Sequence, residues 1–500
     1  MRLSDPVPLL ARLRRPWWRT LLHWLLLAAV TAAYLWAHLR LGHALADQTN
    51  HDLLRSDQEN NMRCARSAAA RAPMQLAKGF RTNLRDWLPH YTDGVVNPLW
   101  PRIAATFASA DDRQFFNDGK RWNVAFGAVF LGVCALWLGR RWAVPAVLVF
   151  LLAAGLGAVI PRSPWFQPEP VYYALFFASF VTSLAILKSN PVWRYALLGL
   201  LTGLAYLAKA SIHPLLLVFF GVTALRFLGA VWPHGGKAGP RTRSEWNPSS
   251  HFIGFSVLLA VHLVVISPRL GYSQQAFGHP LHSYPSYWMW MDDFEQGYAW
   301  MGTHNTREQL TAMAREDKPS ARRWLETHSR EEGWRRLADG TWWQVRRLVA
   351  SDPTPRAKDG SPKKPWKAML EYPGWALVAL AGLGLVAAAG AIVYQRREKL
   401  PVHRQQPERG MMALFVLGTV ACYALLHGWY TPVGDGDRFM LALFPPLVFS
   451  LLAAGEDIVR RLQARALPPG FAAAYRAGQW VLAGWLGWRM AELLLNPRFA

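Results

Sequence analysis

Charged residues and cysteines are scarce in this sequence. Only 17% of its 500 residues are charged, whereas a typical soluble domain carries about 25%. Of its three cysteines, Cys134 and Cys422 lie inside apolar runs and Cys64 stands alone. Neither a disulfide framework nor a cysteine metal site is therefore predicted. The sequence also lacks an internal repeat, a glycine-rich phosphate loop and a low-complexity tract.

Hydrophobic residues dominate instead and make up 52% of the chain. Apolar runs near 20 residues, the length that a helix needs to cross a bilayer, recur along the whole sequence. This pattern predicts an all-α polytopic membrane protein, because a helix satisfies its own backbone hydrogen bonds in lipid. About eleven transmembrane helices are expected, at residues 21–41, 123–139, 143–160, 171–187, 194–208, 214–232, 251–267, 374–394, 411–429, 438–454 and 477–495.

Tryptophan and basic residues are unusually abundant. Many of the 26 tryptophans lie at the ends of apolar runs, which is typical of a membrane interface. The formal net charge is +23, and in a soluble protein this would suggest nucleic-acid binding. Here lysine and arginine gather in short loops, as expected of cytoplasmic topology signals and of contacts with anionic membrane lipids. We therefore expect membrane lipids, and no nucleic acid, among the partners.

Positive charge in the short loops predicts the orientation of the chain. Arginines precede the first apolar run, so residues 1–20 are expected in the cytoplasm. Alternation of the spans then brings the other basic short loops to the same side. The arginine-rich start, the apolar core and Ala44-Leu45-Ala46 also imitate a cleavable signal peptide. That core is longer than the ~7–15 residues of a usual signal, which favours a retained signal anchor.

Two long polar segments, residues 42–122 and 268–373, are expected on the opposite, periplasmic side, where they would form a cap. The first segment belongs to an N-terminal transmembrane core at 21–267, and residues 374–500 would form the C-terminal transmembrane helices. Three short turns are expected on the same side as the cap: 161–170, 209–214 and 430–437.

Carboxylates, cations and aromatic residues converge on that side. Asp57 and Glu59 follow the first apolar run at once, and carboxylates beside a membrane are costly unless they are exposed, paired or used. The further candidates at this face are Glu169, Lys209, His213, Tyr287, Trp290, Asp292, Asp293 and Arg438. Such a set suits an anionic, lipid-linked sugar, because cations hold phosphate and a carboxylate can take a proton from an acceptor hydroxyl.

Four short patterns also occur in a fixed order. They are Asp57-Gln58-Glu59, the turn Asn97-Pro98-Leu99-Trp100-Pro101, the span ending from Gly203 to Lys209 and His213, and the helix opening Asp437-Arg438-Phe439 that continues to Pro445-Pro446. Together they resemble the GT-C superfamily of integral-membrane glycosyltransferases. The closest subgroup is the bacterial one similar to protein O-mannosyltransferases and the lipid A aminoarabinose transferase. That family often has an aromatic residue after an Asp-Glu pair, whereas Asn60 and Asn61 follow Glu59 here.

The resemblance implies transfer of a sugar from a polyprenyl-phosphate donor to an acceptor, with inversion, at the periplasmic face of the bacterial inner membrane. It implies a general base at Asp57 or Glu59, and the choice between them stays open. The residues expected to hold the donor phosphate are Lys209, His213 and Arg438. Those expected to line a sugar or acceptor pocket are Glu169, Tyr287, Trp290, Asp292 and Asp293. No metal or other cofactor is expected, because no ligand spacing suggests one.

Simpler roles exist for these residues. Asp57 could cap a helix, and Lys209 could extend to lipid headgroups. The cluster around Asp292 could serve packing alone. Two other functions also stay open: a transporter or flippase of a lipid-linked substrate, and an O-antigen polymerase or ligase. A transporter would be expected to carry charges at mid-membrane, and apart from Arg226 and His262 the predicted span centres contain almost none.

Overall fold

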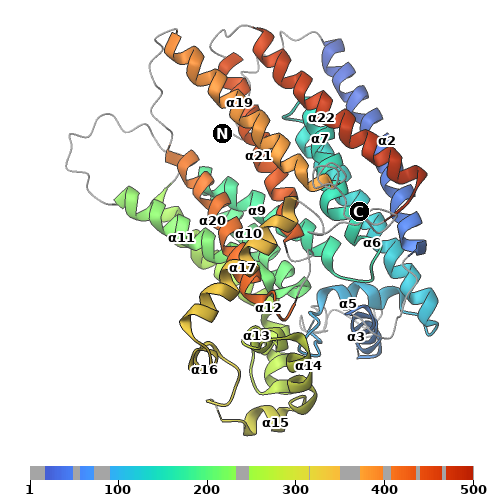
Figure 1. Cartoon of the computed structure of the whole chain (residues 1–500), viewed down its shortest axis with the longest axis vertical. Helices are drawn as coiled ribbons and strands as arrows, with labels where there is room; N and C mark the ends of the chain where they lie inside the picture. The colour runs from blue at the N-terminus through green and yellow to red at the C-terminus, as the bar shows by residue number, and fades with distance from the viewer. Residues whose placement is uncertain are drawn as a thin grey trace.

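The computed structural model describes residues 17–48, 57–71, 90–231, 247–314, 316–349, 372–397, 407–434, 440–463 and 469–498. Every regular element within these ranges is a helix. Long helices fill the upper and middle parts of the molecule, and shorter helices lie at its lower end (Figure 1).

Nine helices in the described part of the chain are long and apolar enough to cross a membrane. Six of them correspond to α2 (Trp17–Gln48), α6 (Asp112–Gly139), α9 (Glu169–Lys188), α12 (Pro248–Phe277), α19 (Ala376–Arg397) and α20 (Pro407–Tyr430). The other three include α7 (Val144–Ala154) with α8 (Ile160–Arg162), α11 (His213–Val231) and α21 (Phe444–Gln463). The expected all-helical architecture with several membrane-spanning candidates is therefore confirmed.

Two of the eleven expected spans form helices that fall outside these nine. The helix α10 (Val192–Ala208) is apolar but only 17 residues long. The helix α22 (Pro469–Leu495) has 27 residues, and the charged side chains Arg476, Arg489 and Glu492 lie along it. Both helices nevertheless contribute to the main apolar core, where α10 packs against α9 and α12 and α22 packs against α7.

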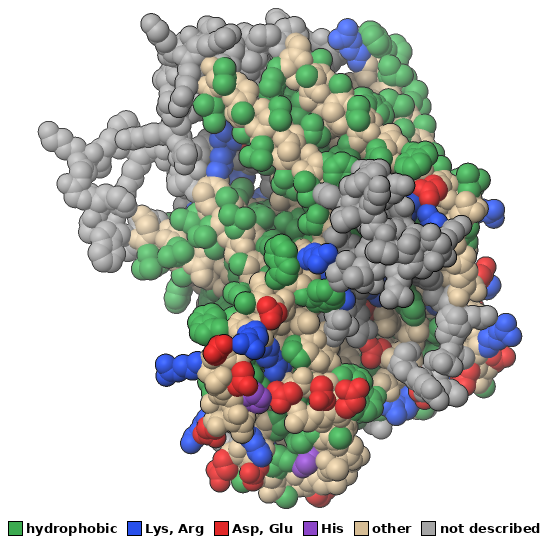
Figure 2. All heavy atoms as spheres, viewed as in Figure 1, with side chains coloured by type: hydrophobic (Ala, Val, Ile, Leu, Met, Phe, Trp, Pro, Cys, Tyr) green, Lys and Arg blue, Asp and Glu red, His purple; other side chains and the backbone are tan. Residues whose placement is uncertain are grey.

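The two polar segments contain short helices. The first segment contributes α3 (Asp57–Arg71) and α5 (Leu99–Ala104), and the second contributes α13 (Tyr284–Trp288), α14 (Phe294–Thr303), α15 (Arg307–Ala312), α16 (Ala321–Thr327) and α17 (Arg330–Val349). A 2.9 Å backbone hydrogen bond from Tyr284 N to Gly94 O joins the two segments. Acidic and basic side chains gather at this lower end, whereas apolar side chains cover most of the upper helices (Figure 2).

Two expected boundaries differ in the structure. The motif at 97–101 was expected to be a turn, but its last three residues begin α5. Pro101 is tolerated there, because residues in the first helical turn need no backbone N–H donor. The helix α12 continues beyond its expected end at residue 267 as far as Phe277. Gly278 then ends it with a φ of 76°, a left-handed conformation that glycine adopts readily.

Candidate functional site

One end of the bundle is joined by polar contacts, and we term it the polar end. Here α2, α10, α12 and α20 end, and α6, α9 and α11 begin. Lys120 Nζ donates a 2.6 Å hydrogen bond to Ala46 O and so links α6 to α2. Trp429 Nε1 donates a 2.8 Å hydrogen bond to Met289 O and so fixes the second polar segment to α20. Segments predicted to share one side of the membrane are therefore neighbours in space.

Glu169 and Lys209 form an ion pair at the polar end. Glu169 is the first residue of α9, and Lys209 directly follows the last residue of α10 in extended backbone. The Lys209 Nζ lies 2.9 Å from Glu169 Oε1. The Glu169 side chain is 2% exposed and the Lys209 side chain 19% exposed. Each charge is thus largely removed from water and is stabilised by the other.

The turn after Lys209 is fixed to its surroundings by hydroxyl and aromatic groups. Tyr423 Oη donates a hydrogen bond to Ser211 O, which ties α20 to this turn. His213 is the first residue of α11. The centre of its ring lies 5.0 Å from the centre of the Tyr206 ring. Lys209 and His213, both predicted to hold donor phosphate, therefore lie on one short turn between α10 and α11.

A second buried cation, Arg269, lies beside this turn and was missed by the sequence analysis. Its side chain is 2% exposed, and its guanidinium carbon lies 5.2 Å from the centre of the Tyr206 ring. Its Nη2 donates a 3.0 Å hydrogen bond to His282 O. The residue follows Pro268 at the end of an apolar run. That position is the same signal that singled out Lys209, so the sequence could have identified it.

Asp57 and Glu59 lie partly exposed in the first turn of α3. Between them, Gln58 is buried, and its Oε1 accepts a 2.9 Å hydrogen bond from Phe166 N. Phe166 belongs to the turn that leads into Glu169. The start of α3 is therefore anchored beside the start of α9, which brings the candidate base and the ion pair to the same end of the bundle.

The acidic residues of the aromatic segment have contacts of their own. Asp293 caps α14, because its side chain accepts a 2.7 Å hydrogen bond from Gln296 N. Asp292 Oδ1 lies 3.6 Å from Arg336 Nη1 and 3.2 Å from His328 Nε2. Asp293 thus stabilises the start of α14, whereas Asp292 links this segment to Arg336 of α17.

The two aromatic residues predicted for the same pocket also pack between helices. The Trp290 ring lies 5.6 Å from the Trp429 ring of α20. The Tyr287 ring lies 5.0 Å from the Trp300 ring of α14. Of the five residues predicted for the pocket, Glu169 is the one that the structure places in an ion pair with Lys209.

One predicted phosphate-binding residue, Arg438, lies outside the described residues. Within the part of the chain that is described, no group of three or more His, Cys, Asp or Glu side chains is arranged to hold a metal ion.

The cations of the polar end differ in how far their charge is balanced. Lys209 is neutralised by Glu169, whereas among the described residues the Arg269 guanidinium donates to the carbonyl oxygens of Pro280 and His282. A carbonyl dipole balances a positive charge less completely than a carboxylate does. Within the described residues, Arg269 is therefore the less completely balanced of these two cations. Comparison with protein-family models and with curated proteins finds no match for this chain.

Proposed function

We propose that this protein is a membrane glycosyltransferase of the GT-C type. It would move a sugar from a polyprenyl-phosphate donor to an acceptor at the periplasmic face. The observation that carries the proposal is the hydrogen bond between Gln58 and Phe166. It anchors the acidic start of α3 at the bundle end that also holds the Glu169–Lys209 ion pair. A proton acceptor and buried cations at one end of a membrane bundle suit attack on a sugar phosphate.

The reaction needs one base and a stabilised leaving group. Asp57 takes the proton from the acceptor hydroxyl as its oxygen attacks the anomeric carbon, with Glu59 as the alternative base. The bond from that carbon to the phosphate oxygen breaks, and the lipid phosphate leaves with the electron pair. Lys209, His213 and Arg438 stabilise its negative charge. Attack opposite the leaving group inverts the configuration of the sugar.

The proposed topology is that of eleven spans with a cytoplasmic N-terminus. It counts α10 and α22 as spans in addition to the nine helices that meet the length and composition criteria within the described residues. Both polar segments then lie on the periplasmic side of a bacterial inner membrane. Lipid-linked sugars suit a site on this side, because nucleotide sugars are cytosolic donors.

The test is transfer by Asp57→Asn beside the wild type. Purified protein in vesicles would receive radiolabelled polyprenyl-phosphate sugars, and label moved to membrane-extracted acceptors would be counted. Loss of a general base is expected to lower the rate on the order of 10²-fold or more. Asp118→Asn, in α6 at the same end, is the matched control.

Other outcomes would change the assignment. A wild-type rate in Asp57→Asn together with a large loss in Glu59→Gln would make Glu59 the base. No transfer by the wild type with any donor would contradict the proposal and favour a transporter of a lipid-linked substrate. Insertion and abundance of each variant would be measured alongside.

A further inference from the structure

The helix α17 has three distinct faces. Its buried face includes Gly340, Gln344 and Leu348. Its exposed polar face carries Arg335 and Asp339. The third face is mostly apolar and at least partly exposed, and its members recur at the three- to four-residue spacing of one helix side: Trp334, Leu337, Ala338, Thr341, Trp342 and Val345.

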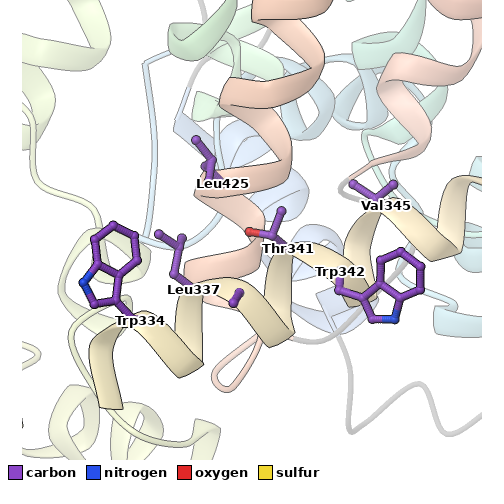
Figure 3. Close-up of a pocket in the computed structure, with 7 residues that line it drawn as sticks. Trp334, Leu337, Thr341, Trp342, Val345 and Leu425 are labelled. Atoms are coloured by element: carbon purple, nitrogen blue, oxygen red, sulfur yellow. The ribbon is translucent and has the colours of Figure 1, made fainter. Parts of the chain in front are cut away.

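The apolar face opens into a groove against α20. Its volume is about 380 Å³, and Leu425 of α20 lies across from the α17 side chains (Figure 3). Trp334 and Trp342 remain 71% and 67% exposed. A soluble surface rarely presents two such tryptophans beside an apolar groove. This face therefore needs a covering.

The position of the groove on α20 indicates what covers it. The side chains of Leu414, Leu417 and Leu425 lie on one side of α20 and are all exposed. Because α20 is a candidate membrane span, this side faces lipid. The same exposed stripe continues from Leu425 onto the apolar face of α17.

The crossing of the two helices sets the depth of α17. It occurs where Gly340 of α17 meets Gly428 of α20, so closely that a Cβ on Gly340 would lie 2.0 Å from Gly428 O. Gly428 lies near the end of α20 at Tyr430, where a span leaves the hydrocarbon. Figure 3 shows α17 running across α20 rather than along it. The helix thus lies at the level of the membrane interface.

We propose that α17 is an in-plane interfacial helix whose apolar face inserts among the lipid acyl chains around α20. Trp334 and Trp342 lie at the headgroup boundary, which indole rings favour. The polar face with Arg335 and Asp339 faces water, and the buried face rests on α20. This division of faces is the pattern of helices that lie on a bilayer. The inference does not depend on the transferase activity.

The test is the lipid exposure of single spin labels on the full chain. Cys422, which is half-buried, is first replaced by alanine, and labelling of that protein checks that the buried Cys64 and Cys134 do not react. Nitroxide labels are then placed by Trp342→Cys and, as the matched control one turn away on the polar face, by Asp339→Cys. The protein is reconstituted in vesicles of phosphatidylethanolamine and phosphatidylglycerol.

Accessibility is measured to oxygen, which concentrates in lipid, and to a water-soluble nickel complex. We expect the oxygen-to-nickel ratio to be several-fold higher for Trp342→Cys than for Asp339→Cys. A nickel-dominated signal at both positions would place α17 in water and overturn the inference. Low access of both reagents at Trp342→Cys would show a protein covering instead, and would overturn it equally. Trp334→Cys repeats the measurement should Trp342→Cys fail to insert.

Discussion

Lys209 and Glu169 lie 2.9 Å apart across the ends of two helices, with Glu169 almost wholly out of water. Removing one partner leaves the other charge without its main stabilisation. We expect Lys209→Met to lower stability by about 3–5 kcal/mol, the range for breaking a buried pair. The measurement is the thermal aggregation midpoint of the purified protein in detergent.

The double variant Lys209→Met with Glu169→Gln tests whether the two charges stabilise each other or whether each residue matters independently. Because it removes both charges, it should be more stable than Lys209→Met alone. A double variant less stable than either single change would contradict the pairing. Transfer should stay low in the double variant if Lys209 also holds the donor phosphate.

The anchor of α3 gives a second prediction. Gln58→Leu leaves the buried Phe166 N–H without its acceptor, a loss expected to cost about 1–3 kcal/mol. The start of α3 should loosen and the transfer rate should fall. Hydrogen exchange of residues 57–71 and transfer are measured together, with the partly exposed Asn60→Ala as control. An unchanged rate with a loosened α3 would count against Asp57 as the base.

Arg336 is expected to matter more for the second segment than Asp292 does. Its guanidinium lies over the rings of Trp324 and Trp429, at 5.5 Å and 4.8 Å, and its Nε donates to Trp429 O at 2.9 Å. Lysine cannot reproduce this planar stacking. Arg336→Lys should therefore cost about 1–3 kcal/mol, read as faster proteolysis of residues 284–349.

Asp292→Asn should cost under about 1 kcal/mol, because the Asp292 side chain is half exposed and water screens its charge. Asparagine also keeps an oxygen for the hydrogen bond from Trp324 Nε1. Strong loss of transfer in a protease-resistant Asp292→Asn would support the pocket role predicted from the sequence. Unchanged transfer would leave Asp292 a packing residue.

Acid should destabilise the second polar segment through His282. Burial, followed by the nearby charge of Arg269, lowers the pKa of His282 from 6.5 to about 4. The unfolded chain therefore binds a proton that the folded chain does not, and stability falls as the pH drops from 6.5 to 4. The full loss is about 3 kcal/mol, at 1.36 kcal/mol per pKa unit.

The variant His282→Phe tests this pH dependence. Phenylalanine keeps a ring to stack on Phe277, whose ring centre lies 4.3 Å away, but it cannot be protonated. Its melting temperature should fall less than that of the wild type between pH 6.5 and 4. Equal acid sensitivity of the two proteins would mean that other groups set this pH dependence.

Much of the fold could be predicted because the helices follow apolar runs. Residues 171–187 were expected to form a span, and α9 covers Glu169–Lys188. The end of α12 was missed because the apolar run stops at Pro268 and Arg269, while the helix continues as far as Phe277. The helix start at Leu99 was missed because prolines on both sides suggest a turn, although both fit at a helix N-terminus.

The sequence could identify candidate residues of the site, but it could not predict which of them contact one another. Glu169 and Lys209 each stood out as a charge at a span end, but 40 residues separate them, and a single sequence does not show which ends meet. Asp292 looked like a pocket residue because aromatic residues surround it in sequence. In space its partners include Arg336, whose stacking on Trp429 depends on how α17 crosses α20.

The contact between Gln58 and Phe166 also has a consequence for biosynthesis. The two residues are 108 positions apart, so Gln58 leaves the ribosome roughly 5–20 s before its partner at the usual rates of synthesis. During that interval α6 and α7 are synthesised, and the start of α3 does not yet have its contact with Phe166. The contact that anchors Asp57 and Glu59 therefore forms only after the turn before α9 has been made, and a nascent chain that stops earlier leaves the start of α3 without this anchor.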